Sequence, residues 1–323
     1  MVPFALSARK RGPQPKSSPP DALLCYLLYL KVPSDAAVLA KTLGISETQF
    51  TGNLDRIRPI LNAALHTKWP EMAPRPLDYD ARLIFEAGLL VDNTTTECFR
   101  PKGRFGEVKH YFDGHHYVYG LKSEIAVTSA RPHVMVAVSP HEPGSVSGYE
   151  IHKANYRNYL PYLRRTPEEL HQAIDRGDDH PYWAAIGDKE YIGPAADTPN
   201  ERRITQKKGF NLNQGEKKRN KDIKKERTPV ECFLGRMIRK WPLFSTVYKI
   251  DHSKFDQDFE NACLLTNEDI TISNLTPEDG EFYKKFLDAR VERFKNEEKK
   301  RKASSQNYTK NKKAKIDFYW VSD

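Results

Sequence analysis

The 323-residue sequence predicts an α/β fold, a mixed sheet with flanking helices, preceded by a small all-α domain. Two observations support this prediction. Residues 21–67 carry apolar side chains at helical spacing, whereas from residue 83 onwards short apolar stretches of strand length alternate with helical ones. Strands that alternate with helices are typical of a sheet covered by helices. The length is sufficient for one substantial core and a smaller domain.

Charge is distributed unevenly along the chain. The net charge of +9 combines three basic segments, residues 1–20 at +4, 201–227 at +7 and 290–316 at +8, with a remainder near −10. An acidic body with basic segments is a common arrangement in proteins that bind polyanions. The alternative is that these segments are solvated and bind nothing.

The cysteines and the N-terminus bear on the cellular compartment. Cys25, Cys98, Cys232 and Cys263 lie far apart, and no pair has metal-binding spacing, which fits a reducing compartment. The apolar run "ALLCYLLYL" is nine residues long, too short to span a bilayer. In "MVPFALSARKRG" the charges follow the apolar residues, the reverse of a secretory signal. We therefore expect a soluble intracellular protein without a membrane partner.

The N-terminal part predicts a basic arm and a DNA-binding domain. Residues 1–20 are rich in proline and basic residues and predict disorder. Within residues 21–67, Asp21 is the expected N-cap of a first helix, Gly44 permits a turn, and Ser46 caps a last helix. This pattern indicates a helix-turn-helix, with an ordinary helical hairpin as the alternative. The expected DNA contacts on its last helix are Ser46, Thr48 and Gln49.

The larger domain is expected at residues 83–280, after a proline-rich linker at 68–82. Its expected strands are Gly88–Val91, Tyr117–Val127, Val134–Val138 and a short strand before Asp188. Residues 197–227 form a basic insert with too few apolar residues for a packed core, which predicts a mobile arm. Pro229 favours the first turn of a following helix. Residues 281–323 predict a charged helix and a basic tail.

Three carboxylates have the sequence context of a metal site. Asp92 ends the apolar run "GLLV", Asp188 follows "WAAIG", and Glu231 lies on the predicted helix "VECFLGRMIRK". Strand-end carboxylates on neighbouring strands lie side by side, and a helix packed on the sheet can add a third. Three such groups repel one another unless a cation neutralises them, and hard divalent cations with oxygen ligands suit that role. Taken alone, Asp92 is better explained as a turn former or a cap.

Other candidate sites are weaker. "GSVSG" at residues 144–148 has Val146 where a nucleophile elbow has serine. His110, His115 and His116 could bind a metal, but a turn around Asp113–Gly114 or a substrate contact explains them better.

Several blocks around the carboxylates resemble one known family. "GLLVDNTTTECFRP", "YFDGHHYVYGLKSEIAV", "SPHEPGSVSGYEIHK", "IGDKEYIGP", "RTPVECFLGRMIRKWPLF" and "NACLLTNEDI" occur in that order. Over about residues 83–270 the sequence resembles the DDE endonucleases of PIF/Harbinger-type transposases. The resemblance implies an RNase H-like fold and a catalytic, metal-binding triad of Asp92, Asp188 and Glu231. It also covers Arg227, four residues before the glutamate, and the pair Gly235-Arg236 after it.

The sequence departs from the family pattern at four places. The family's Asp-Gly-Thr is here Asp92-Asn93-Thr94. The family usually has an aspartate after Pro-Gly-Ser, and this sequence has Ser147-Gly148 instead. The glycine of Asp-x-Gly-Tyr is Glu190, and a lysine common seven residues after the glutamate is Ile238. All three triad carboxylates are retained.

The resemblance implies a metal-dependent DNA endonuclease that hydrolyses phosphodiester bonds and can transfer a strand. Mg²⁺ or Mn²⁺, as two ions about 3.5–4 Å apart, would be the cofactor. The alternative is a domesticated, non-catalytic DNA-binding or adaptor protein that retains the fold. The expected partners are double-stranded DNA, a separate DNA-binding partner protein and a second copy of the chain. Further expected DNA contacts are Lys217, Lys218, Arg219, Lys221, Arg227 and Arg236. "KKRK" at 299–302 and "KNKKAK" at 310–315 predict import into the nucleus.

Overall fold

The structure is a computed structural model that describes residues 17–69, 83–209 and 211–320. A mixed sheet lies at its centre, with strands hydrogen-bonded in the order β2-β3-β1-β6-β7 and with β4 and β5 also paired to β3. β3 runs antiparallel to β1, whereas β6 runs parallel to β1 and β7 parallel to β6. The strands are β1 (Ala87–Glu97), β2 (Phe112–Asp113), β3 (Val118–Thr128), β4 (Met135–Val138), β5 (Glu142–Pro143), β6 (Ala184–Ile186) and β7 (Arg202–Ile204). This mixed sheet with flanking helices confirms the predicted RNase H-like fold class.

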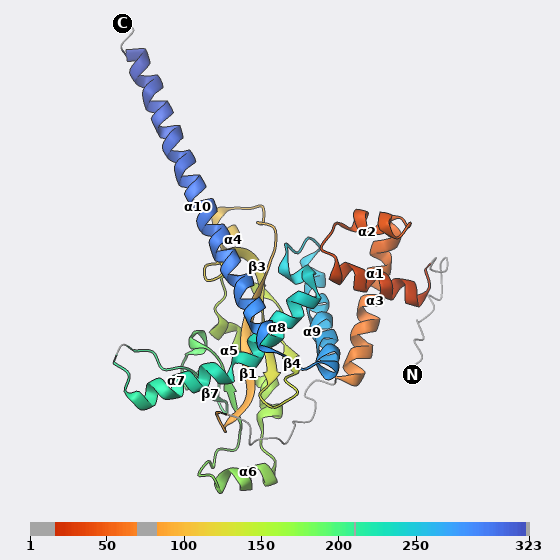
Figure 1. The fold of residues 1–323 in the computed structure, drawn as a ribbon, viewed down its shortest axis with the longest axis vertical. Helices are drawn as coiled ribbons and strands as arrows, with labels where there is room; N and C mark the ends of the chain where they lie inside the picture. Colours follow the sequence, from red (N-terminus) through yellow and green to blue (C-terminus); the bar gives the residue numbers. More distant parts are fainter. Residues whose placement is uncertain (1–16, 70–82, 210, 321–323) are drawn as a thin grey trace.

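Helices surround the sheet and extend beyond it (Figure 1). The α-helices are α1 (Pro19–Lys31), α2 (Ala36–Thr42), α3 (Glu47–Lys68), α4 (Phe105–His110), α5 (Gly148–Leu163), α6 (Pro167–Ile174), α7 (Gln214–Glu226), α8 (Thr228–Lys240), α9 (Phe255–Ile272) and α10 (Pro277–Trp320). Short 3-10 turns are η1 (Lys189–Tyr191), η2 (Ala195–Asp197), η3 (Pro242–Ser245) and η4 (His252–Lys254). In the part of the chain that the structure describes, no helix is both long and apolar enough to cross a membrane.

The two faces of the sheet belong to different apolar clusters. Leu90 and Ile125 belong to the cluster that contains the buried side chains of α8 and α9. Leu89, Val91 and Ala126 belong to the other cluster, with the tyrosines of α5. Because side chains alternate along a strand, Asp92 lies on the α8 face of β1 and its neighbour Asn93 on the α5 face.

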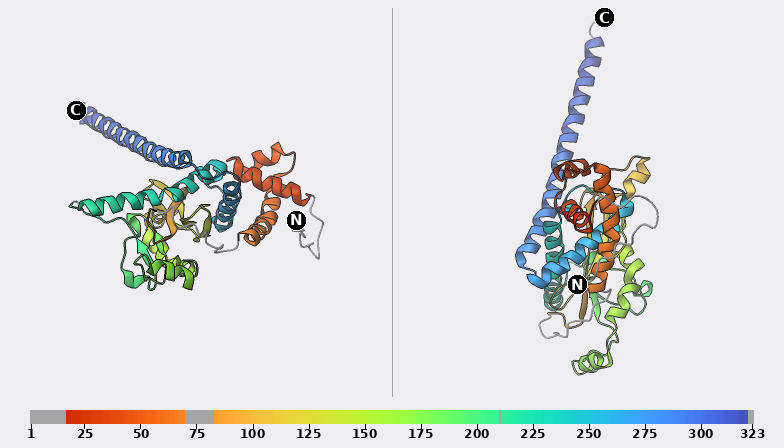
Figure 2. Two further views of the ribbon diagram at one scale, coloured as in Figure 1. Left: turned by 60° about the horizontal axis from the view of Figure 1, so that its bottom comes forward. Right: turned by 90° about the vertical axis from the view of Figure 1, so that its right-hand side faces the viewer.

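The N-terminal helices share the core of the larger domain. Asp258 of α9 is fully buried and accepts hydrogen bonds from Tyr26 (2.7 Å), Tyr248 (2.9 Å) and Arg58 Nε (2.6 Å). The apolar cluster around them is continuous with the cluster on the α8 face of the sheet. The views in Figure 2 likewise place α3 beside α9. The small all-α domain is therefore fixed to the sheet domain by a buried ion pair.

The caps of these helices correct one prediction and confirm another. α1 begins at Pro19, and its N-cap is Ser18, whose hydroxyl accepts a hydrogen bond from the Asp21 amide. The prediction that Asp21 is the N-cap was therefore wrong, and Asp21 instead completes the capping box. Ser46 caps α3 as predicted, after a turn in which Gly44 has a φ of +67°. The predicted arm and linker lie largely outside the described residues, in 1–16 and 70–82.

The basic insert has more structure than its composition predicts. Its first part supplies β7, the outer parallel strand, and its second part forms α7. A capping box between Asn213 and Glu216 starts α7, Ile223 is buried, and Glu226 accepts a hydrogen bond from the Leu83 amide. The expectation of a mobile arm was therefore wrong, because capping and a few contacts with the body are enough to form this helix.

The last helix begins inside the sheet domain. α10 starts at Pro277, and its Asp279 is fully buried, so the predicted boundary at residue 280 falls within the helix. Tyr283 donates to Thr94 Oγ1 (3.2 Å), and Arg290 donates to the Thr95 carbonyl of β1 (2.7 Å). Beyond Phe294 the side chains through residue 310 are exposed, and the helix projects from the body (Figures 1 and 2).

Candidate active site

Strand register brings the two predicted aspartates to one level of the sheet. In the parallel pair of β1 and β6, Leu90 lies opposite Ile186, and Asp92 and Asp188 each follow two residues later. β6 ends at Ile186, whereas β1 continues to Glu97. The prediction that Asp92 ends its strand was therefore wrong, although the prediction that both aspartates meet at the end of β6 agrees with the register.

Asp188 is held by the turn that it begins. It is the N-cap of η1, and its Oδ1 accepts a hydrogen bond from the Glu190 amide (2.7 Å). A Cβ on the preceding Gly187 would lie 2.6 Å from the ring of Tyr191, so the chain can turn this tightly only with glycine there. The aspartate thus has both the capping role and the position next to Asp92.

Glu231 reaches the same site from α8. It lies in the first turn of that helix, while Val230, Phe233 and Leu234 bury the other side of the helix against the sheet. Because burial fixes these apolar residues, Glu231 stays on the flank of α8, where it is half-buried.

Asp92 lies close enough to the other two carboxylates for their charges to act on its pKa. Burial raises the pKa of Asp92 to about 6; the nearby Arg227 opposes this rise, and the charges of Asp188 and Glu231 add to it. The Asp92 side chain is 17% exposed. Neighbouring like charges disfavour the ionisation of all three carboxylates unless a cation compensates them.

Arg227 supplies a compensating cation. Its Nη2 lies 3.2 Å from Asp92 Oδ2, and its side chain is 9% exposed. Burial alone would lower its pKa, but the carboxylates of Asp92, Asp188 and Glu231, in that order, raise it. One guanidinium therefore offsets part of the negative charge of the carboxylate cluster.

The family described as DDE superfamily endonuclease matches residues 91–267. This range is more than half of the chain and contains all three carboxylates and Arg227. The chain belongs to the DDE superfamily endonucleases. No curated protein matches it. Membership of this endonuclease family indicates a nuclease with a DNA substrate.

The donor groups of this DDE endonuclease cluster are of the type that binds a divalent metal, although their spacing is too wide to hold one. Three carboxylates offer the oxygen donors that Mg²⁺ and Mn²⁺ prefer, and the cluster already holds the positive charge of Arg227. Within residues 17–69, 83–209 and 211–320, no three His, Cys, Asp or Glu side chains gather closely enough to hold a metal ion. The present spacing therefore suits the guanidinium, and metal binding would require the carboxylates to move closer together.

Three departures from the family pattern meet on the other face of β1. Asn93 donates from Nδ2 to the Tyr191 hydroxyl (2.6 Å). A Cβ on Gly148 would collide with Asn93 Nδ2, and it would lie 3.4 Å from Glu190 Oε2. Asn93 therefore fits this DDE endonuclease only because residue 148 has no side chain.

A buried network that the sequence did not reveal lies on the same α5 face. Glu124 of β3, opposite Asn93, accepts from Tyr159 (2.6 Å) and lies 3.0 Å from Nδ1 of His152, whose Nε2 contacts Glu201. Burial alone would lower the pKa of His152, but the two glutamates outweigh it and raise that pKa to about 10. The stretch "YEIHKANYRNYLPYLR" predicted a helix here, and nothing in it marked His152 as buried.

This network predicts a pH dependence of stability. A histidine whose folded pKa is raised from 6.5 to about 10 contributes stability that is complete below pH 6.5 and lost as the pH rises toward 10. The unfolding free energy of wild type minus that of His152→Gln should therefore shrink steadily between pH 7 and 10. Urea titrations at several pH values measure it. A difference that stays constant over this range would contradict a protonated His152.

Arg236 corrects a predicted DNA contact. Its Nε and Nη2 donate to Asp279 (2.9 and 2.7 Å) and its Nη1 to Asp269 (2.8 Å), and the residue is buried. A Cβ on Gly235 would collide with the Asp279 carbonyl, so glycine allows α8 and α10 to approach. The expectation that Arg236 binds DNA was wrong, since every nitrogen of its guanidinium is used to hold α9 and α10.

The other predicted contacts fall into three groups. Arg227 lies inside the carboxylate cluster rather than on the surface. Ser46 Oγ is engaged as a cap, Gln49 donates to Ser17 Oγ (2.9 Å), and Thr48 is exposed. The predicted contacts on α7 are all exposed, namely Lys217, Lys218, Arg219 and Lys221.

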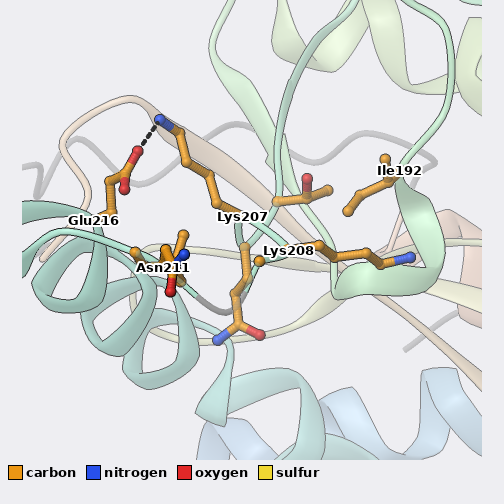
Figure 3. A pocket seen from close by; sticks show the side chains of 9 residues that line it. Ile192, Lys207, Lys208, Asn211 and Glu216 are labelled. Atoms are coloured by element: carbon orange, nitrogen blue, oxygen red, sulfur yellow. Dashed lines mark hydrogen bonds and ion pairs between the residues drawn. The ribbon is translucent and has the colours of Figure 1, made fainter.

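An open pocket of about 790 Å³ lies where the segment after β7 meets α7 (Figure 3). In Figure 3, Lys207 pairs with Glu216 (2.8 Å), and Lys208 extends toward Ile192. The remaining lining residues are Thr205, Gln206, Gly209, Asn211 and Leu212. Ammonium, amide and hydroxyl groups of this kind are the donors that contact sugar and phosphate oxygens.

Proposed function

We propose that this chain is a metal-dependent DNA endonuclease of the PIF/Harbinger transposase type, with Asp92, Asp188 and Glu231 as its triad. The observation that carries the proposal is that these carboxylates, from β1, the turn after β6 and α8, all act on one buried cation, Arg227, whose Nη2 lies 3.2 Å from Asp92 Oδ2. The family match supports the class of activity. Hydrolysis of a phosphodiester bond is the proposed reaction, and attack of a 3′-hydroxyl on a second DNA is the proposed second step.

The proposed mechanism assigns each carboxylate a role. Mg²⁺ or Mn²⁺, as one or two ions held by the triad, would polarise the phosphodiester and increase the nucleophilicity of water. Asp92 is within electrostatic reach of the other two acids and is ionised above its pKa of about 6. Asp188 keeps a fixed orientation because its Oδ1 is bonded to the Glu190 amide. Glu231 comes from the first turn of α8, whereas both aspartates come from the sheet side. The scissile phosphate would therefore lie beside this turn of α8.

A plasmid assay separates this proposal from its alternative, a non-catalytic DNA-binding or adaptor protein. Purified protein is incubated with supercoiled plasmid and MgCl₂, MnCl₂ or EDTA. Nicking that requires the divalent cation supports the endonuclease. DNA binding without nicking under every metal condition would favour the adaptor.

We further propose that α7 grips the DNA backbone. At 100° per residue, its lysines fall within one arc of about 120°, roughly opposite the buried Ile223. They are Lys217, Lys218, Lys221, Lys224 and Lys225. Arg219 lies outside this arc and pairs with Glu86 (3.6 Å). These five exposed lysines form one basic surface of α7.

Neutralising this surface should weaken binding to every duplex. Each phosphate contact contributes about 0.9 to the salt slope of binding. Replacing Lys217, Lys218, Lys221 and Lys225 by glutamine should therefore flatten that slope by roughly two to four units. Binding isotherms at several salt concentrations measure the slope. The control variant loses the same charge on α10, at Lys295, Lys299, Lys300 and Lys302. If the two variants have equal salt slopes, net charge alone explains the effect.

We propose that sequence preference comes from the start of α3 or from a separate DNA-binding partner protein. Thr48 is exposed, whereas Ser46 and Gln49 already have internal hydrogen bonds, so Thr48 is the best placed of the three for a base contact. A Thr48→Ala variant that keeps its sequence preference would favour the partner protein. A homodimer is proposed as the active unit, and light scattering with and without DNA tests it.

We also propose a nuclear localisation signal in the projecting part of α10. Residues 295–310 are exposed and contain "KKRK", which an import receptor could reach in the folded protein. A fluorescent reporter fused to residues 295–317 should accumulate in the nucleus, and replacing Lys299, Lys300, Arg301 and Lys302 by alanine should abolish that accumulation. An evenly distributed wild-type reporter would contradict the proposal.

A further inference from the structure

Arg227 occupies a position that a surface DNA contact would not need. It is the residue at which α7 ends and α8 begins, and Pro229 follows in the first turn of α8. Its backbone is helical, and its side chain turns inward to Asp92, with Nη2 3.2 Å from Oδ2. Neighbouring basic residues on α7 point to solvent, so the inward direction is specific to Arg227.

The surroundings of Arg227 are electrostatic rather than hydrogen-bonded. Its Nε is buried and has no hydrogen-bond partner among the described residues. A hydrogen-bonded structural arginine such as Arg236 instead uses its Nε, Nη1 and Nη2. Arg227 is therefore held by the combined charge of the carboxylates and by one contact to Asp92. A charge held in this way can be replaced by another cation more easily than one fixed by several directed hydrogen bonds.

We propose that Arg227 is the internal counter-ion of the carboxylate cluster and that it competes with the divalent cation for Asp92. The inference rests on the proposed metal-dependent function of the same site. A dication bound to Asp92 Oδ2 would lie within a few ångströms of the guanidinium, and like charges at that range repel strongly in a partly buried site. Binding of the metal must therefore displace Arg227 from Asp92. Arg227 in turn stabilises the metal-free protein against repulsion among the three acids.

Competition makes a prediction about affinity that does not involve catalysis. Removing the charge in Arg227→Gln should strengthen Mn²⁺ binding by about 5- to 150-fold, the usual range of coupling between two interacting sites. Arg227→Lys keeps the charge and should stay closer to wild type. Lys225→Gln, two residues away and exposed, removes the same charge outside the cluster and should change the affinity little. Calorimetric titration of the full-length chain with MnCl₂ in the absence of DNA measures all three.

Stability provides the second readout. Without metal, Arg227→Gln should unfold at a lower temperature than wild type, and MnCl₂ should raise its midpoint more than it raises that of wild type. KCl at equal ionic strength should not reproduce the gain. If Arg227→Gln is too unstable to titrate, recovery of its folding by MnCl₂ alone still supports competition, and failure to recover overturns it.

The outcomes distinguish the inference from the function on which it rests. Mn²⁺ binding that is equal or weaker in Arg227→Gln than in wild type overturns competition and leaves the endonuclease proposal intact. An absence of Mn²⁺ binding in wild type and in both Arg227 variants overturns the metal-dependent function, and competition with it. Tighter binding in Arg227→Gln that is lost when Asp92→Asn is added supports both.

Discussion

Replacing Asp92 by asparagine should lower metal-dependent DNA nicking by at least about 10³-fold, the scale for losing one member of a group of catalytic residues that act as a unit. Asparagine has nearly the same shape but lacks the charge that would hold the metal. Asp188→Asn and Glu231→Gln should behave alike, and combining them should add little. Single-turnover nicking of supercoiled plasmid measures the loss, and nicking by Asp92→Asn at the wild-type rate would contradict the triad.

The same variant should not be destabilised. The pKa of Asp92 is raised from 3.8 to about 6, so folding disfavours its charged form. A group of this kind costs stability above its folded pKa, and removing its charge relieves that cost. Asp92→Asn should therefore unfold at or above the wild-type temperature at pH 8. Asp256→Asn, a half-exposed aspartate outside the cluster, is the control and should leave nicking unchanged.

Replacing Arg58 by methionine should lower the free energy of unfolding by about 3–5 kcal/mol, the usual cost of removing one partner from a buried ion pair. Arg58 Nε lies 2.6 Å from Asp258 Oδ1, and both side chains are almost completely buried. Without Arg58, the Asp258 carboxylate keeps the tyrosine hydroxyls of Tyr26 and Tyr248 but has no neutralising charge. Urea unfolding of wild type and variant measures the difference.

An exposed ion pair between the same two parts of the chain is the matched control. Lys68 of α3 pairs with Glu268 of α9, and the lysine side chain is 60% exposed. Lys68→Met should cost no more than about 1 kcal/mol, because water solvates the remaining charge. If Arg58→Met costs as little as Lys68→Met, the N-terminal helices are not held to α9 by the buried pair.

The fold class could be predicted from the sequence because it depends on local pattern. Apolar runs of strand length defined β1, β3 and β4 to within a few residues at most ends, and Ser46 marked the start of α3. The polar residues 93–97 were not recognisable as strand. They extend β1 because β3 pairs with them along their whole length and α10 covers them.

The fates of the arginines could not be predicted in this way. Arg227 and Arg236 both lie close to the predicted glutamate, and both have the same chemistry in the sequence. Arg236 became structural because Asp279, 43 residues later, accepts two hydrogen bonds from its guanidinium. Arg227 became the counter-ion of the cluster because β1 and the turn after β6 bring Asp92 and Asp188 to it.

By itself, the sequence determined the α/β class, the order of the carboxylates and the helix caps, since each depends on residues a few positions apart. Only the tertiary structure decided which basic groups are exposed, which pair with buried acids, and that Asn93 packs against a glycine at 148. The physical reason is that the free energy of a charged or bulky side chain depends on groups within a few ångströms. The fold brings those groups together from distant parts of the chain.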